Sequence, residues 1–215
     1  MKTAPVAAKG RTVRRQSDAV AVVVGGAVLG AGMFAVRDGT VSGFEESAFR
    51  AVNDLPGALY PLLFPFQQVS AILVAPLVAV VAAFYRRFRL AGMLLLAALA
   101  KLGSERIVKA IVSRQRPATS IGPDVHRRGI VSIHGESFVS GHAVLVAAMA
   151  GLVAPYLRGR WRYVPWALVA FVMIGRVYVG AHNPLDVICG TALGLGIAGL
   201  LNLAFGVPES PSRPA

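Results

Sequence analysis

The sequence has 215 residues, of which 55% are hydrophobic, and a formal net charge of +12. This composition excludes an ordinary soluble domain, which would expose large apolar patches to water, and indicates an integral membrane protein. The charge alone would fit nucleic-acid binding, but the basic residues lie between apolar stretches, which is a pattern of membrane topology. We therefore expect a membrane protein with no nucleic-acid partner.

The N-terminal part of the chain consists of a basic tail, a long apolar run and a mixed segment. Residues 1–17 are predicted to be a disordered cytoplasmic tail, and the apolar residues 19–36 are numerous enough to cross a bilayer. A basic start before an apolar run also describes a signal peptide. Further spans follow and no clear cleavage site is present, so we interpret the run as a signal anchor. Residues 37–65 predict an amphipathic helix at the membrane interface.

Five more apolar stretches follow along the chain. They predict spans at residues 66–85, from Leu90 onward, and at 138–157, 163–179 and 184–205. The polar residues 114–137 contain Pro and Gly and are expected to form a loop, while the Pro/Ser-rich residues 207–215 are expected to be a disordered tail. The sequence therefore predicts an all-α bundle of six transmembrane helices over residues 18–206.

The third predicted span ends in a charged segment. Lys101, Glu105 and Lys109 recur at intervals of four, so they share one face of a helix. We expect Glu105 to form an ion pair with Lys109 or Lys101, and so to hold Lys109 in place.

The distribution of basic residues predicts the orientation of the bundle. The N-terminal tail and the basic clusters at residues 86–89 and 158–162 fall on one side, which the positive-inside rule makes cytoplasmic, and six spans put both termini there. The opposite side carries cations that topology does not require: Lys109, Arg114, Arg116, Arg127 and Arg128. Binding an anion would explain this cluster.

Three short polar stretches are predicted to lie at the outer ends of different spans. They cover residues 109–117, 139–142 and 175–186, and they would converge if the spans pack as a bundle. Each stretch also has a purely structural interpretation. Lys109 and Arg116 could extend to the interface, and Ser140 and Asp186 could only stabilise helix N-termini. Arg176 fits such an interpretation least well, because it lies within an apolar span where charge is costly.

A phosphate site would explain the cations and the small residues together. Lys109, Arg116 and Arg176 would neutralise phosphate oxygens, with Arg suited to bidentate contact. A helix that begins at Ser140 would offer free backbone N–H groups to an anion, and Gly141 would not obstruct its approach.

The two histidines and the carboxylate supply the remaining groups of a phosphoryl-transfer site. Asp186 follows His182 by four residues, so it could accept one imidazole N–H and leave the other nitrogen free to attack phosphorus. His142 would protonate the departing oxygen and then activate water. In this interpretation His182 is the nucleophile, His142 the acid and base, and Asp186 the orienting group.

The three stretches resemble the signature motifs of the type 2 phosphatidic acid phosphatase (PAP2) superfamily, which are K-x6-R-P, P-S-G-H and S-R-x5-H-x3-D. The matching residues are Lys109, Arg116 and Pro117, then Ser140, Gly141 and His142, then Arg176, His182 and Asp186. Two positions depart from the pattern. Val139 stands where the motif has Pro, and Gly175 stands where it has Ser, which removes a potential hydrogen bond to phosphate.

The resemblance implies a six-helix architecture and a phosphohistidine mechanism that needs neither a metal nor another cofactor. The single cysteine, Cys189, excludes a cysteine-based metal cluster. Four potential ligands occur in the outer loop, and their spacing fits no metal motif: Asp124, His126, His134 and Glu136.

The expected function is a multi-pass cell-membrane phosphatase that acts on a lipid at the extracytoplasmic face. The family resemblance implies a membrane lipid phosphate as partner, such as undecaprenyl diphosphate, phosphatidic acid or phosphatidylglycerol phosphate, and the sequence does not choose among them. Two alternatives remain open: a lipid phosphotransferase with the same phosphoenzyme, and a non-enzymatic lipid transporter or scaffold. The oligomeric state is not predicted.

Overall fold

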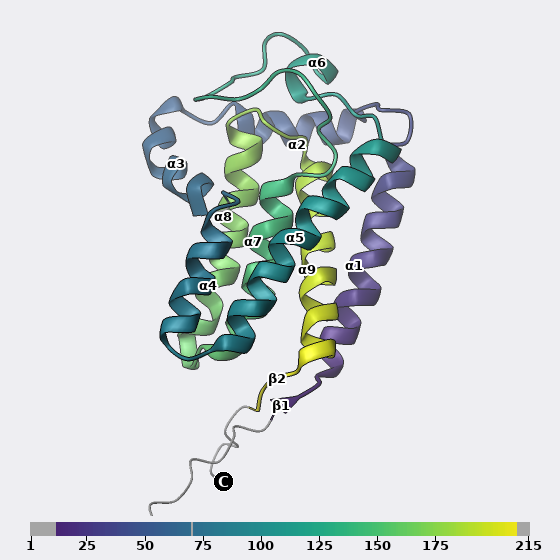
Figure 1. Cartoon of the computed structure of the whole chain (residues 1–215). Coiled ribbons are helices and arrows are strands. Elements are labelled where there is room, and N and C mark those ends of the chain that lie inside the picture. The colour runs from purple at the N-terminus through teal and green to yellow at the C-terminus, as the bar shows by residue number, and fades with distance from the viewer. Residues whose placement is uncertain (1–11, 70, 210–215) are drawn as a thin grey trace, which may run out of the picture.

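Roughly parallel helices form a bundle in the computed structural model, which describes residues 12–69 and 71–209 (Figure 1). The helices that run along the bundle are α1 (Gln16–Ala35), α4 (Val74–Phe84), α5 (Phe88–Ile111), α7 (Gly141–Val153), α8 (Val164–Tyr178) and α9 (Pro184–Phe205). Short 3-10 helices, η2 (Ala154–Tyr156) and η3 (Gly159–Tyr163), connect α7 to α8. The all-α prediction is therefore confirmed for the bundle.

Two helices among the described residues, α1 and α9, are long and apolar enough to cross a membrane. A buried helix of a soluble protein and an N-terminal signal sequence meet the same criteria, so this finding does not establish six spans. The other helices are shorter or, like α5, carry charges along their length. The six-span topology stays a prediction.

The predicted span at residues 66–85 is wrong as a single helix. The chain forms α3 (Tyr60–Val69), has a turn at residues 71–73 and begins α4 at Val74. Pro76 provides the physical reason, because proline has no N–H to donate and its ring clashes with the carbonyl four residues earlier. A helix can therefore start just before Pro76 but cannot run through it without a kink.

Helix α9 packs closely against both α1 and α7 because glycines remove side chains at the crossings. A Cβ at Gly25 of α1 would lie 2.5 Å from the carbonyl oxygen of Ala192, and a Cβ at Gly194 of α9 would overlap the carbonyl oxygen of Val144. The core beside these contacts contains Leu94, Leu145 and other buried aliphatic residues. The packing fixes the position of the N-terminus of α9, where the candidate site lies.

The described ends of the chain meet at one end of the bundle (Figure 1). Strand β1 (Thr12–Val13) pairs antiparallel with β2 (Val207–Pro208). Nearby, the buried Asp18 accepts hydrogen bonds from Arg15 and, at 2.9 Å, from Asn202. The prediction of disordered tails is therefore wrong for residues 12–17 and 207–208, because pairing and the buried Asp18 order them. The rest of that prediction concerns residues 1–11 and 210–215, which lie outside the described residues.

The opposite end of the bundle is covered by short helices and loops. Helix α2 (Gly43–Asn53) lies across the top of the bundle in Figure 1, with Phe49 buried and Phe44 exposed. The predicted amphipathic helix within residues 37–65 is thus confirmed, and the 3-10 helix η1 (Gly57–Leu59) and α3 follow it. The predicted loop at residues 114–137 is also confirmed, with one helical turn, α6 (Pro117–Ser120), inside it.

Candidate active site

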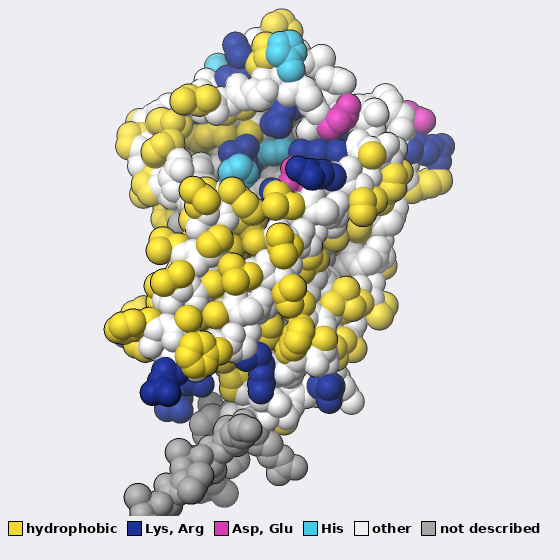
Figure 2. Space-filling model, in the orientation of Figure 1, with side chains coloured by type: hydrophobic (Ala, Val, Ile, Leu, Met, Phe, Trp, Pro, Cys, Tyr) yellow, Lys and Arg dark blue, Asp and Glu magenta, His cyan; other side chains and the backbone are white. Residues whose placement is uncertain are grey.

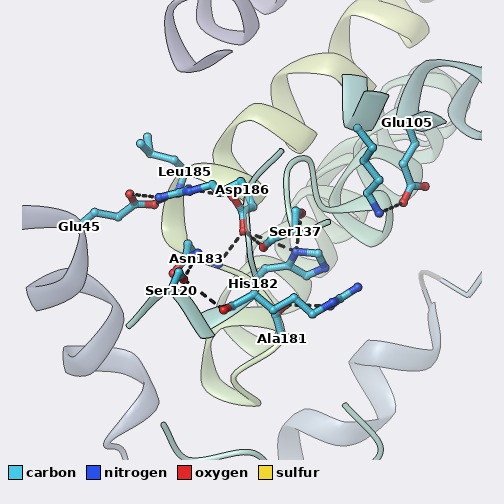
Figure 3. Close-up of polar contacts among 12 residues, drawn as sticks. Glu45, Glu105, Ser120, Ser137, Ala181, His182, Asn183, Leu185 and Asp186 are labelled. Atoms are coloured by element: carbon cyan, nitrogen blue, oxygen red, sulfur yellow. Dashed lines mark hydrogen bonds and ion pairs between the residues drawn. The ribbon is translucent and has the colours of Figure 1, made fainter. Parts of the chain in front are cut away.

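The side chain of His182 lies in the turn that joins α8 to α9 and is 3% exposed. Its Nδ1 lies 3.0 Å from the carbonyl oxygen of Ser137 and 3.7 Å from the nearest oxygen of Asp186 (Figure 3). A carbonyl oxygen only accepts hydrogen bonds, so Nδ1 carries the proton and Nε2 carries the lone pair. His182 is therefore held in the tautomer that a nucleophilic Nε2 requires.

Asp186, which we predicted to accept the imidazole proton directly, lies farther from Nδ1 of His182 than the carbonyl oxygen of Ser137 does. The carboxylate of Asp186 accepts hydrogen bonds from the Ser137 hydroxyl and, at 2.8 Å, from the backbone N–H of Asn183. These donors occupy the oxygen that faces His182. Asp186 thus acts one step away: it fixes Ser137, whose carbonyl group orients the imidazole ring.

The remaining oxygen of Asp186 belongs to a buried ionic network. Arg114 donates to Asp186 at 2.9 Å and to both oxygens of Glu45 on α2. Glu45 also accepts from the backbone N–H of Leu185 at 2.9 Å. Burial alone would lower the pKa of Arg114, but its hydrogen bonds and its attraction to Glu45 and Asp186 outweigh this and raise the pKa. The network joins α2 to the N-terminus of α9.

Two cations of the predicted anion-binding cluster have structural roles instead. Arg114 is 0% exposed, and two carboxylates neutralise its charge, so that charge is not available to a phosphate, although its Nε has no partner among the described residues. Arg128 donates to the carbonyl oxygens of Asn53, Leu55 and Tyr178, and its guanidinium lies 4.1 Å from the centre of the Tyr178 ring. The expectation was wrong for these residues because sequence position does not reveal buried acceptors.

The other end of the site contains the expected lysine–glutamate pair. Glu105 accepts from Lys109 at 2.7 Å and from Lys101 at 2.6 Å, so the predicted pairing is confirmed for both lysines. The Glu105 carboxylate also lies against Gly141, where a Cβ would overlap it. The Glu105 carboxylate therefore takes the space that the missing side chain of Gly141 leaves, and the backbone N–H groups of the helix N-terminus remain for an anion.

Ser140 is the N-cap residue of α7, as expected, but its side chain does not cap the helix. Its backbone N–H donates to the carbonyl oxygen of Asp186 at 3.0 Å, which joins the N-termini of α7 and α9. The Ser140 hydroxyl is buried and has no partner among the described residues. His142 follows in the first turn of α7, close enough to interact electrostatically with His182 and Arg176.

Two arginines lie beside the histidines. Arg116 donates to the carbonyl oxygens of Ala181 at 3.0 Å and of His134 at 3.2 Å, which anchors it beside His182. Arg176, near the end of α8, donates to the side-chain oxygen of Gln67 at 3.3 Å. Its buried Nε has no partner within residues 12–69 and 71–209. Both guanidinium groups thus keep donors that a bound anion could use.

The electrostatic surroundings of His182 favour its neutral form. Burial lowers the pKa of His182 to about 4, and the charges of Arg176 and Arg116 act in the same direction, while Asp186 opposes them. A neutral imidazole at physiological pH leaves Nε2 available as a nucleophile.

Basic and histidine side chains gather in a hollow near the top of the molecule (Figure 2). Hydrophobic side chains cover the surface directly below the hollow in the same view, down to a second group of basic side chains at the opposite end. Exposed apolar residues on α4 and α5 include Leu77, Val80, Leu95 and Leu99. A polar site thus adjoins an extended apolar surface.

The structure brings the predicted residues of all three stretches together at one end of the bundle, and it adds residues that we did not predict. Ser137, Glu45 and Gln67 have no characteristic spacing in the sequence, because each acts through a contact between distant segments. Within the described ranges, no three His, Cys, Asp or Glu side chains are grouped so as to hold a metal ion.

Comparisons with known proteins relate this arrangement to one family. Residues 88–207, more than half of the chain, match the model of the PAP2 superfamily. No curated protein sequence matches the chain.

Two solved structures share the fold. The first is LpxE from Aquifex aeolicus, with a TM-score of 0.66 and 22% identity, over 74% of this chain and 94% of that protein. The second is the first transmembrane PAP2-type phosphatidylglycerolphosphate phosphatase from Bacillus subtilis, with a TM-score of 0.62 and 20% identity, over 87% of this chain and 95% of that protein. At these identities the likeness concerns the fold alone.

Proposed function

The chain belongs to the PAP2 superfamily, and from this premise we propose that it is a membrane phosphatase that removes phosphate from a lipid through a phosphohistidine at His182. The observation that carries the proposal is the hydrogen bond from Nδ1 of His182 to the carbonyl oxygen of Ser137. With Nδ1 bound to Ser137, the lone pair of Nε2 points away from that carbonyl group. Arg116 and Arg176, which keep unused donors, lie beside His182.

In the first step, Nε2 of His182 attacks phosphorus while the bond to the leaving oxygen breaks. The protonated imidazole of His142 gives a proton to that oxygen and becomes neutral, and the dephosphorylated lipid departs. The product is a phosphoryl group bonded to Nε2, with the Nδ1 proton still held by Ser137 and the Ser137 hydroxyl held by Asp186.

In the second step, the neutral His142 accepts a proton from water, and the hydroxide oxygen attacks the same phosphorus atom. The bond between phosphorus and Nε2 breaks, which restores neutral His182 and releases inorganic phosphate. Arg116, Arg176, Lys109 and the N-terminus of α7 with Ser140 and Gly141 stabilise the charge on the transferring group. Neither step requires a metal ion.

The adjoining apolar surface supports a lipid as the substrate. A lipid phosphate has an anionic head group and an apolar tail, and the charged hollow lies directly above an apolar face (Figure 2). One of the two similar structures described above is that of a transmembrane PAP2-type phosphatidylglycerolphosphate phosphatase. Undecaprenyl diphosphate, phosphatidic acid and phosphatidylglycerol phosphate are the substrates to be tested.

We further propose that residues 18–206 form the membrane domain, with six spans and both termini in the cytoplasm. The meeting of β1 and β2 at one end of the bundle supports termini on the same side. Basic residues at positions 86–89 and 158–162 support the cytoplasmic assignment of that end. The site then faces the extracytoplasmic side, and a tag at either terminus should be inaccessible from outside intact cells.

The test of the function is the release of phosphate from these lipids by the purified protein and by His182→Ala. We expect release from at least one lipid by the wild type and none above background by the variant. Release that persists in the variant would reject the nucleophile. Phosphate release without an acceptor lipid would argue against an obligate phosphotransferase, and inactivity on every lipid would favour a transporter or scaffold.

A further inference from the structure

Helix α3 contributes a side chain to the site although it lies outside the residues that match the family. Gln67 of α3 is 6% exposed, and its Oε1 accepts a hydrogen bond from Nη1 of Arg176 at 3.3 Å. A guanidinium group has donors only, so the atom of the amide that faces it must be the oxygen. The amide nitrogen then lies on the side of Gly175.

Gly175 and Gln67 occupy complementary positions. A Cβ at residue 175 would overlap the amide nitrogen of Gln67, so any side chain at 175 would displace the amide. Gly175 is the position at which this chain departs from the Ser of the third motif. The Gln67 amide therefore fills the space that a serine side chain at position 175 would occupy.

The contact between α3 and α8 is built to hold Gln67 at this place. The ring of Phe66, the preceding residue, stacks on Phe171 with the ring centres 4.6 Å apart. Phe171 precedes Gly175 by four residues, so both lie on the same face of α8. Leu63 packs beside Tyr178 on the same side of α8. The apolar contacts thus position α3 so that Gln67 reaches Arg176.

Charge distinguishes the partner of Arg176 from the partners of Lys109 and Arg114. Lys109 is paired with Glu105, and Arg114 is paired with Glu45 and Asp186. Arg176 instead contacts an uncharged amide, which orients the guanidinium without neutralising it. Its full charge remains for an anionic ligand, and the buried Nε remains as a donor.

We propose that Gln67 is a positioning residue for Arg176 as a phosphate ligand, and that it takes the place of the serine which the third motif has at position 175. The proposal rests on the proposed function only in taking phosphate as the ligand. It assigns a part of the site to α3, a segment that the family match does not include.

The test is a cycle of variants on these two residues. Gly175→Ser should displace the amide and lower kcat/KM and the affinity for orthovanadate, a phosphate mimic, by about tenfold, the effect of one lost hydrogen bond to a charged group. Adding Gln67→Ala should remove the overlap and restore most of the loss. Gly196→Ser is the matched control, because nothing lies within 4 Å of a Cβ there.

Gln67→Glu separates positioning from space filling, because it keeps the size and shape of the side chain. We expect it to raise KM and weaken vanadate binding by about tenfold or more, since a carboxylate would neutralise Arg176. A merely structural Gln67 would leave these quantities unchanged in Gln67→Glu. If the effects of Gly175→Ser and Gln67→Ala on kcat/KM and on vanadate affinity simply add in the double variant, the proposal is also overturned.

Vanadate binding, measured as a shift of the melting temperature in detergent, keeps this test separate from the test of the function. A wild type that binds vanadate but hydrolyses no lipid would reject the phosphatase and leave Gln67 to be judged by binding alone. A wild type that binds no vanadate would overturn both proposals.

Discussion

The carbonyl oxygen of Ser137, and not the carboxylate of Asp186, accepts the Nδ1 proton of His182. Ser137 contributes twice, since its hydroxyl group donates to Asp186 while its carbonyl group holds the imidazole. The orientation of the nucleophile therefore depends on the backbone of the segment that leads into α7. Asp186 supports that backbone from α9.

This arrangement predicts different effects for two neighbouring substitutions. Ser137→Ala keeps the carbonyl group, so we expect kcat to fall by less than about tenfold, with a stability loss of about 1–2 kcal/mol for the lost hydroxyl contact. Asp186→Asn leaves the buried Arg114 with one carboxylate fewer and should cost about 3–5 kcal/mol of stability. Thermal unfolding and kcat, measured for both variants, check this. A nearly inactive but stable Asp186→Asn would instead indicate direct contact with the imidazole.

Arg114 is predicted to stabilise the fold and to take no part in phosphate binding. Arg114→Met leaves Glu45 and Asp186 buried without their cation, so we expect a loss of about 3–5 kcal/mol in unfolding free energy. Arg114→Lys keeps the charge but not the bidentate contact and should lose less. For the protein that remains folded, the affinity for vanadate should stay within about twofold of the wild type, because Arg114 is expected to make no contact with the anion. A lost phosphate contact of about 1.4 kcal/mol would instead lower the affinity tenfold. A selective loss of vanadate affinity at unchanged stability would contradict this assignment.

Glu105→Gln tests whether the ion pair positions Lys109. The amide keeps the size of the side chain beside Gly141 but no longer attracts Lys101 and Lys109. We expect KM to rise by about tenfold, the equivalent of one charge-assisted hydrogen bond. Steady-state kinetics on a lipid phosphate check this, with Glu46→Gln as the control, since Glu46 is a partly exposed glutamate that forms an ion pair with Arg50 on α2. Unchanged expression, affinity and turnover in Glu105→Gln would reject the role of Glu105.

The low pKa of His182 predicts how stability depends on pH. The unfolded chain takes up this proton near pH 6.5 and the folded protein only near pH 4, so the contribution of His182 is complete above about pH 6.5 and is lost as the pH falls toward 4. The difference corresponds to about 3 kcal/mol. Melting temperatures measured between pH 7.5 and pH 4.5 should fall less steeply for His182→Gln than for the wild type. Equal slopes would show that His182 is not buried in its neutral form.

Much of the site was predictable because its residues lie at helix ends. The order of apolar stretches placed the residues of three separate segments at one end of a bundle, and the family motifs gave them roles. The ion pair of Glu105 with Lys109 was predictable as well, since a spacing of four puts two side chains on one face of a helix.

The remaining features depend on contacts between distant segments, which no local pattern encodes. Arg114 looked like a surface cation because its partner Glu45 lies far away in the sequence, on α2. The contact of the Ser137 carbonyl group with His182 could not be predicted from side-chain patterns, because every residue has a backbone carbonyl group. The break in the span predicted at residues 66–85 could have been predicted from Pro76, which disfavours a continuous helix. The long apolar run led us to predict one span instead.

The most direct test of the account is the identification of the residue that carries the phosphoryl group. The wild type and the His142→Ala variant are incubated with a lipid phosphate labelled in its phosphoryl group, quenched in alkali, in which phosphohistidine survives, and digested for peptide mapping. We expect the label on the peptide that contains His182, with a slower loss of the label in His142→Ala because His142 can no longer activate water, and no label in His182→Ala. A label on any other residue, or release of phosphate by His182→Ala at the wild-type rate, would contradict the account.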